Sequence, residues 1–160
     1  MIINSKMQMY LDELKNIEIQ DRNCSIDFGS IESIIFPTFI EWDDCILLRQ
    51  KGNTELPPHF SPNQFISDRT AFEANFNHIH LNDMFDDEPI QIFRTAIKIL
   101  DVWAAVLYRQ FSAQRNFILI LSYDGEEIVL RFYSTREYES PWLDISSIES
   151  YLDGLMIIEI

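Results

Sequence analysis

The sequence predicts an α+β fold: a single domain over residues 1–160, with helices packed on a mainly antiparallel sheet. Three observations predict it: an amphipathic helical pattern at the start, a long apolar helix in the middle, and a hairpin over residues 116–135. The 160 residues suit one domain, and a hydrophobic content of 47% is enough for a core.

Helical spacing is clearest in two segments. Near the N-terminus, apolar residues recur every three or four positions: Met7, Tyr10, Leu11, Leu14 and Ile17. Asn4 or Ser5 would cap this helix. Pro89 begins the longest predicted helix, which runs to about Phe111 and has only a narrow polar stripe, so most of it should be buried. Pro62 predicts another helix, to about residue 76.

The hairpin signal lies in NFILILSYDGEEIVLRFYS, where Asp124-Gly125 favours a two-residue turn. This turn would pair Tyr123 with Glu126 and Leu121 with Ile128. Asp144 could then cap a short helix that stops near Gly154, and LMIIEI should join the hairpin's sheet as a final strand. Residues 24–50 are ambiguous, with one or two strands or a short helix plus a strand, and 51–62 reads as a loop.

The charge excludes several functions. The net charge is −14, from 26 acidic against 12 basic residues. Nucleic-acid binding needs positive charge, so direct binding of nucleic acid is not expected, and neither is an anionic membrane surface. No signal peptide or transmembrane segment is apparent, and two cysteines are too few for a disulfide scaffold, so a cytoplasmic protein with reduced thiols is expected.

Two histidines in NHIHLNDMFDDE are the only candidates for a metal site. If the segment is extended, His78 and His80 share one face and could bind one zinc ion, with Asp83, His59 or a cysteine as a third ligand. A lone H-x-H is unspecific, so no metal or other cofactor is predicted. The sequence has no nucleophile motif and no glycine-rich phosphate loop, so it does not predict an enzyme.

Acidic residues gather around aromatic ones at three places, and this combination suits an interface with a basic partner protein. Tyr138, between two acids, should be exposed. The candidate partner-binding residues are Asp43, Asp44, Asp83, Asp86, Asp87, Glu88, Glu137, Tyr138 and Glu139.

The segments NHIHLNDMF, ILSYDGEEIVLRFYSTRE and PWLDISSIESYL resemble immunity proteins of bacterial polymorphic toxin systems, especially contact-dependent growth inhibition. The resemblance covers about half the chain and carries no catalytic residue. It implies a protein that binds and neutralises a cognate toxin C-terminal domain in the producer's cytosol. Such toxins are often nucleases, which are basic where they hold nucleic acid.

Two other functions stay open. A cytosolic metal-dependent enzyme or sensor could be built around His78 and His80, and stoichiometric zinc would favour it. An acidic mimic of nucleic acid would instead capture several basic proteins rather than one.

Overall fold

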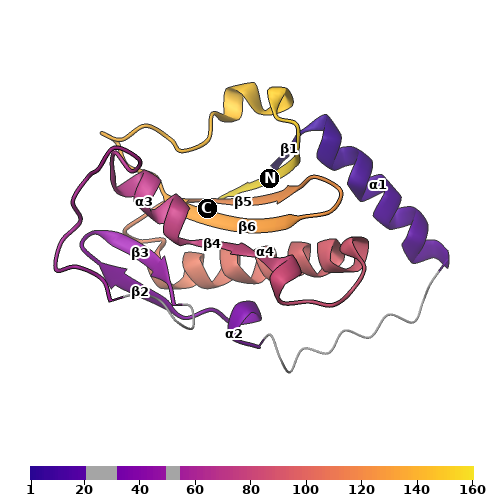
Figure 1. The fold of residues 1–160 in the computed structure, drawn as a ribbon, viewed down its shortest axis with the longest axis horizontal. Helices are drawn as coiled ribbons and strands as arrows, with labels where there is room; N and C mark the ends of the chain where they lie inside the picture. Colours follow the sequence, from indigo (N-terminus) through magenta and orange to yellow (C-terminus); the bar gives the residue numbers. More distant parts are fainter. Residues whose placement is uncertain (21–31, 50–54) are drawn as a thin grey trace.

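The computed structural model describes residues 1–20, 32–49 and 55–160, and it has the predicted α+β architecture. A five-stranded antiparallel sheet has the order β1-β7-β5-β6-β4, and a separate hairpin pairs β2 with β3 (Figure 1). The strands are β1 (Ile2–Ile3), β2 (Phe39–Trp42), β3 (Cys45–Leu48), β4 (His78–His80), β5 (Phe117–Tyr123), β6 (Ile128–Ser134) and β7 (Gly154–Glu159).

The helices differ greatly in length. They are α1 (Ser5–Gln20), α2 (Glu32–Ile35), α3 (Arg69–Phe76) and α4 (Pro89–Phe111), with two 3₁₀ helices, η1 (Leu81–Asp83) and η2 (Ile145–Ser150). The predictions of α1 and α4 are confirmed, and Asn4 caps α1 by accepting a hydrogen bond from the backbone N–H of Met7 at 2.9 Å. Pro89 occupies the first turn of α4, where its missing N–H costs nothing.

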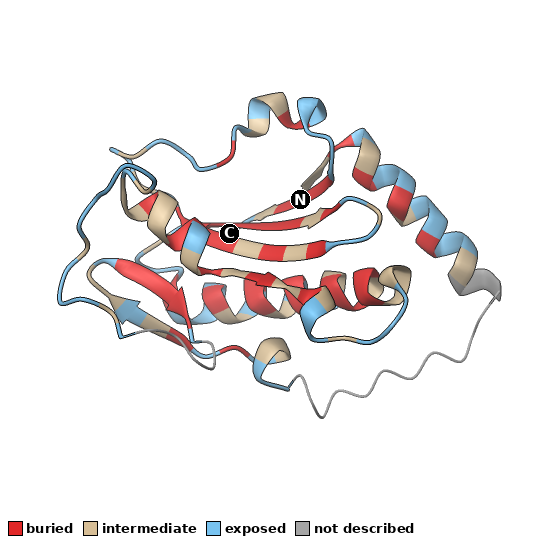
Figure 2. Ribbon diagram, in the orientation of Figure 1, coloured by how far each residue is buried: buried red, intermediate tan, exposed pale blue. Residues whose placement is uncertain are grey.

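Helix α4 covers one face of the sheet and supplies most of the main core. Its inward side chains include Phe93 and Trp103, which pack with Leu119, Leu130 and Phe132 of the hairpin. The opposite face is covered more thinly, by the segment after β6 and by part of α3 (Figure 2). The strands between these layers are therefore buried on both faces, which explains why they are almost continuously apolar.

The predicted hairpin forms, but its register is shifted by two residues. Tyr123 pairs with Ile128 and Leu121 pairs with Leu130, so the turn has four residues, Asp124–Glu127, instead of two. The Asp124 carboxylate accepts hydrogen bonds from the N–H groups of Glu126 and Glu127 and closes this longer turn. A shift of two preserves which side chains share a face, so the predicted faces are correct although the pairs are wrong.

The helix predicted from Pro62 begins later. The Asn63 side chain accepts the N–H groups of Phe65 and Ile66, which holds a turn in place of a first helical turn. Helix α3 begins only at Arg69, after Asp68 caps it through the N–H of Ala71 at 2.7 Å. Residues 55–68 are therefore a loop.

The C-terminal part behaves largely as predicted. Strand β7 pairs with β5, and Asp144 caps η2 by accepting from the N–H of Ser146 at 3.0 Å. The predicted short helix is a 3₁₀ helix, and Gly154 opens β7 instead of stopping the helix. In the ambiguous segment, the described residues form α2 and the β2–β3 hairpin, while 24–31 and 50 lie outside the described residues, as do 51–54 of the predicted loop.

Candidate functional site

Asp43 and Asp44 form the two-residue turn between β2 and β3. Both have positive φ, 44° and 69°, as a tight hairpin of this kind requires, and aspartate tolerates this better than most residues. Asp43 accepts hydrogen bonds from the N–H of Phe60 at 2.7 Å and from Arg69 at 2.8 Å. These contacts, the Phe60 N–H first, hold the pKa of Asp43 below its ordinary value.

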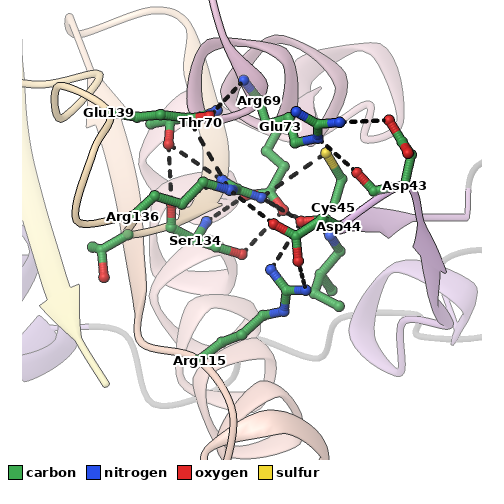
Figure 3. A network of polar contacts seen from close by, with 12 residues as sticks. Asp43, Asp44, Cys45, Arg69, Thr70, Glu73, Arg115, Ser134, Arg136 and Glu139 are labelled. Atoms are coloured by element: carbon green, nitrogen blue, oxygen red, sulfur yellow. Dashed lines mark hydrogen bonds and ion pairs between the residues drawn. The ribbon is translucent and has the colours of Figure 1, made fainter. Parts of the chain in front are cut away.

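Behind this turn lies a buried ion pair between Glu73 of α3 and Arg136. Glu73 is fully buried, and its Oε1 lies 3.0 Å from Arg136 Nη2 (Figure 3). The same carboxylate accepts hydrogen bonds from the N–H groups of Ile46, at 2.6 Å, and Ser134, at 2.5 Å. A buried carboxylate needs such donors, because its loss of water is otherwise uncompensated.

Arginines also bind the remaining acids of this region. Asp44 pairs with Arg115 at 2.5 Å, and its backbone carbonyl accepts from Arg136 at 2.6 Å. The Glu139 carboxylate accepts the N–H groups of Arg69 and Thr70 at the start of α3, at 3.3 and 2.7 Å. We call this group the arginine cluster; it consists of Asp43, Asp44, Arg69, Glu73, Arg115, Arg136 and Glu139.

The arginine cluster joins the small hairpin to the large sheet. Asn77, the C-cap residue of α3 and one turn after Glu73, accepts the N–H of Leu48 at 2.8 Å and donates to the carbonyl of Ile46 at 2.8 Å. It also donates to the carbonyl of Phe132 on β6, at 3.4 Å. Glu73 of the cluster and the C-cap residue Asn77 thus bridge the backbones of β3 and β6, which indicates a structural role for this region.

Cys45 lies beside this cluster and is not activated. It is buried, and burial followed by the charge of Glu73 raises the pKa of its thiol to about 12. The nucleophilic form of cysteine is the thiolate, which is therefore almost absent at neutral pH. Cys24 lies outside the described residues.

A second group of acids lies at the other end of the sheet. Asn82 of η1 donates to the carbonyl of Glu126 and accepts the N–H of Ile128, both at 2.8 Å, which holds η1 against the β5–β6 turn. This contact brings together the acids before α4 and those of the turn. We call them the acidic end: Asp83, Asp86, Asp87, Glu88, Asp124, Glu126 and Glu127.

The carboxylates of the acidic end are mostly exposed and unpaired. Within the described ranges, the one ion pair here joins Glu127 to His80, with Oε1 and Nδ1 2.6 Å apart. Asp124 has a lowered pKa because it accepts the backbone N–H groups of Glu126 and Glu127. The acids of the acidic end thus have no arginine or lysine partner among the described residues, whereas arginines bind the acids of the arginine cluster.

The structure divides the predicted partner-binding residues between these two places. Asp83, Asp86, Asp87 and Glu88 belong to the acidic end, and Asp43, Asp44 and Glu139 belong to the arginine cluster, with Glu137 and Tyr138 exposed beside it. Asp83, Asp86, Asp87 and Glu88 of the acidic end precede the first residue of α4, and Arg115 of the arginine cluster follows its last. This helix has 23 residues, so its two ends lie about 33 Å apart, and the two places lie at opposite ends of the sheet (Figure 1).

The two candidate metal ligands lie on the edge strand β4. The rings of His78 and His80 are 5.3 Å apart, and burial lowers the pKa of His78. Each Nδ1 is already bonded, His78 to the carbonyl of Asn75 and His80 to Glu127. In the parts of the chain that the structure describes, no three His, Cys, Asp or Glu side chains are grouped to hold a metal ion.

Comparison with known proteins places the chain in one family. The model of the uncharacterized protein PM0498 family matches residues 2–160. The chain belongs to this family. No curated protein and no solved structure matches it. In the described part of this PM0498-family chain, no helix is both long and apolar enough to cross a membrane.

Some features of these places were not predicted from the sequence. The arginines of the cluster come from segments far apart in the chain, so no local motif indicated them. The acids of the β5–β6 turn were read only as part of a hairpin. One signal was available: Asp43-Asp44, between the apolar segments FIEW and CILL, has the length and composition of a hairpin turn.

Proposed function

We propose that the protein is an immunity protein that binds a cognate toxin domain in the producer's cytosol and blocks it. One observation carries the proposal: exposed carboxylates are concentrated at the acidic end without arginine or lysine partners among the described residues. Charges that are neither paired nor buried contribute little to the stability of the fold. They are, however, well placed to attract a basic partner.

The proposed partner is a toxin domain with a basic surface, of the kind with which a nuclease holds nucleic acid. The acidic end would occupy that surface in place of phosphates and so exclude the substrate. Negative charge at one end of the molecule would also orient the toxin before contact and raise the association rate. Because exposed charges are screened by ions, association should slow as salt rises.

The test is a titration of this protein with the product of the neighbouring gene, using the C-terminal domain where that product is a large secreted protein. We expect a one-to-one complex that abolishes toxicity. Reversing two charges with Asp86→Lys and Asp87→Lys should lower the association rate at low salt by about tenfold or more, because the negative field of the acidic end becomes much weaker and two of its contacts become repulsive. The measurement is stopped-flow association at two salt concentrations.

A matched control carries the same change in net charge elsewhere. Glu32 and Asp101 are exposed and lie outside the acidic end, so Glu32→Lys with Asp101→Lys should leave most of the rate intact. An equal fall of the association rate in both double variants would mean that only the total charge matters, and would remove the acidic end from the proposal. No complex with the well-folded wild-type protein would contradict immunity for that pair, and capture of several unrelated basic proteins would favour a general mimic of nucleic acid.

A further inference from the structure

Asn82 lies where the two acidic segments of the acidic end meet, residues 83–88 and the β5–β6 turn. It belongs to η1 and is half-buried. Its Oδ1 accepts the N–H of Ile128 and its Nδ2 donates to the carbonyl of Glu126, both at 2.8 Å. One neutral amide therefore binds two backbone groups of the turn, while the next residue, Asp83, stays exposed.

This contact replaces a backbone pairing of the sheet. Strand β4 pairs His80 with Val129, so one further residue in the same register would set Leu81 opposite Ile128. The chain leaves the sheet at Leu81 instead, where η1 begins, and the Asn82 side chain accepts the N–H that a continued strand would bind. Asn82 thus lets the acidic residues that follow it leave the sheet without an unpaired amide at Ile128.

Each acidic segment is ordered by contacts of its own. In the turn, the Asp124 carboxylate accepts the N–H groups of Glu126 and Glu127 at 2.8 and 2.7 Å. In η1, Leu81 is fully buried, and its carbonyl accepts the N–H of Met84 at 3.0 Å. The arrangement of the whole acidic end therefore depends on what joins these two ordered segments.

Within the described ranges, three hydrogen bonds join the segment around η1 to the β5–β6 turn. Two come from Asn82, and the third links His80 to Glu127 at 2.6 Å. The joined segments carry seven acidic residues, and like charges repel one another at short range. This repulsion favours separation of the segments, and the neutral amide of Asn82 opposes it without adding a charge.

We infer that Asn82 is a positioning residue for partner binding: it holds the two acidic segments together as one surface without touching the partner itself. The inference rests on the proposed function, in which a basic toxin domain binds the acidic end. A surface that is already ordered loses less conformational entropy when a partner covers it. The total charge governs how fast the partner arrives, whereas the fixed arrangement of the carboxylates governs how long it stays bound.

The decisive variant is Asn82→Asp. The new carboxylate still accepts the Ile128 N–H, but it repels the Glu126 carbonyl and adds a negative charge. If charge alone governed binding, the added charge would slow dissociation of a basic partner or leave it unchanged. We expect the opposite for the product of the neighbouring gene: association at the wild-type rate or faster, and dissociation about tenfold faster. Stopped-flow association and dissociation into excess competitor measure the two rates.

Two further variants separate position from charge and from folding. Asn16→Asp adds the same charge at an exposed site of α1 and should leave the dissociation rate unchanged. Asn82→Ala removes both hydrogen bonds without adding a charge, and should raise the dissociation rate about tenfold at an unchanged association rate. Loss of folding alone would lower the fraction of protein that binds and not the lifetime of the complex, and circular dichroism would verify that each variant is folded.

Hydrogen exchange tests the contact of Asn82 without any partner. In Asn82→Ala, the Ile128 amide should exchange with solvent at least about tenfold faster, while the amide of Ile120, at the centre of β5, stays as protected as in the wild type. Wild-type dissociation rates in both Asn82 variants overturn the inference, as does wild-type exchange at Ile128. No complex with the wild-type protein contradicts the proposed function and with it this role of Asn82, whereas a complex with unchanged dissociation contradicts this inference alone.

Discussion

Glu73 shows how one residue can decide whether a fold is possible. Burying a carboxylate away from water costs free energy unless it is hydrogen-bonded. The two carboxylate oxygens of Glu73 accept hydrogen bonds from Arg136, from the hydroxyl and N–H of Ser134 and from the N–H of Ile46. Each donor belongs to a different part of the chain from α3. The favourable energy of the pair is therefore obtained only when all these segments are in place.

Glu73→Ala should destabilise the protein by about 3–5 kcal/mol, because it leaves the Arg136 guanidinium buried without its partner. Replacing both partners with apolar residues, Glu73→Leu with Arg136→Met, should cost less than the sum of the single changes. Urea unfolding measures these differences. Glu137→Ala, at an exposed neighbouring site, is the control and should change the free energy of unfolding by less than about 0.5 kcal/mol.

At the scale of elements, α1 packs closely against β7 at Gly154, which has no side chain. A Cβ atom at Gly154 would lie 2.9 Å from Cδ2 of Tyr10 and 3.0 Å from the backbone Cα of Met7. Tyr10 in turn contacts Tyr123, with ring centroids 4.4 Å apart. The close approach of helix and strand thus depends on glycine at this position.

Gly154→Ala should displace α1 from β7 and cost about 1–3 kcal/mol, as expected for an added methyl group in a packed site. Because Tyr10 must move, the near-ultraviolet circular dichroism of the tyrosines should change even in the folded state. Ser122→Ala, at a half-buried position of β5, is a control without such a clash. If Gly154→Ala left the free energy of unfolding unchanged, α1 would be able to move away from β7 without loss of stability.

At the scale of the whole molecule, Glu73 of α3 and its C-cap residue Asn77 connect the two sheets, so we expect the sheets to unfold together. The amides of Ile46 and Leu48 donate to Glu73 and Asn77 instead of to another strand. We expect these two amides to exchange with solvent only in global unfolding, with protection within about 1 kcal/mol of the amides at the centre of β5. Native-state hydrogen exchange measures this, and much faster exchange at Ile46 and Leu48 would mean that the β2–β3 hairpin opens by itself.

The sequence indicated the features of the fold that depend on local patterns. Helices α1 and α4 were readable because their apolar spacing extends over many residues, and the hairpin was readable from its alternating faces. The register of the hairpin was not readable. Asn82, more than forty residues away, binds the backbone of Glu126 and Ile128 and so favours the longer turn.

The candidate site was only partly predictable for a similar reason. Sequence reasoning found the acids, and it expected Tyr138 to be exposed, which is confirmed. It could not distinguish acids with arginine partners from those without, because Asp44 meets Arg115 and Arg136 only in the folded chain. For the same reason, the sequence alone made Asp43 and Asp86 equally good candidates for binding a partner.

The bridging side chains Glu73 and Asn77, on α3 and at its C-terminal cap, have a further consequence, for aggregation. A strand with free backbone groups along one edge can recruit a strand from another molecule and start an ordered aggregate. Glu73 and Asn77 form hydrogen bonds with such backbone groups on β3 and also at the end of β6. If α3 detached during heating, two strand edges would be uncovered together, so this short helix also protects the protein against assembly into fibrils.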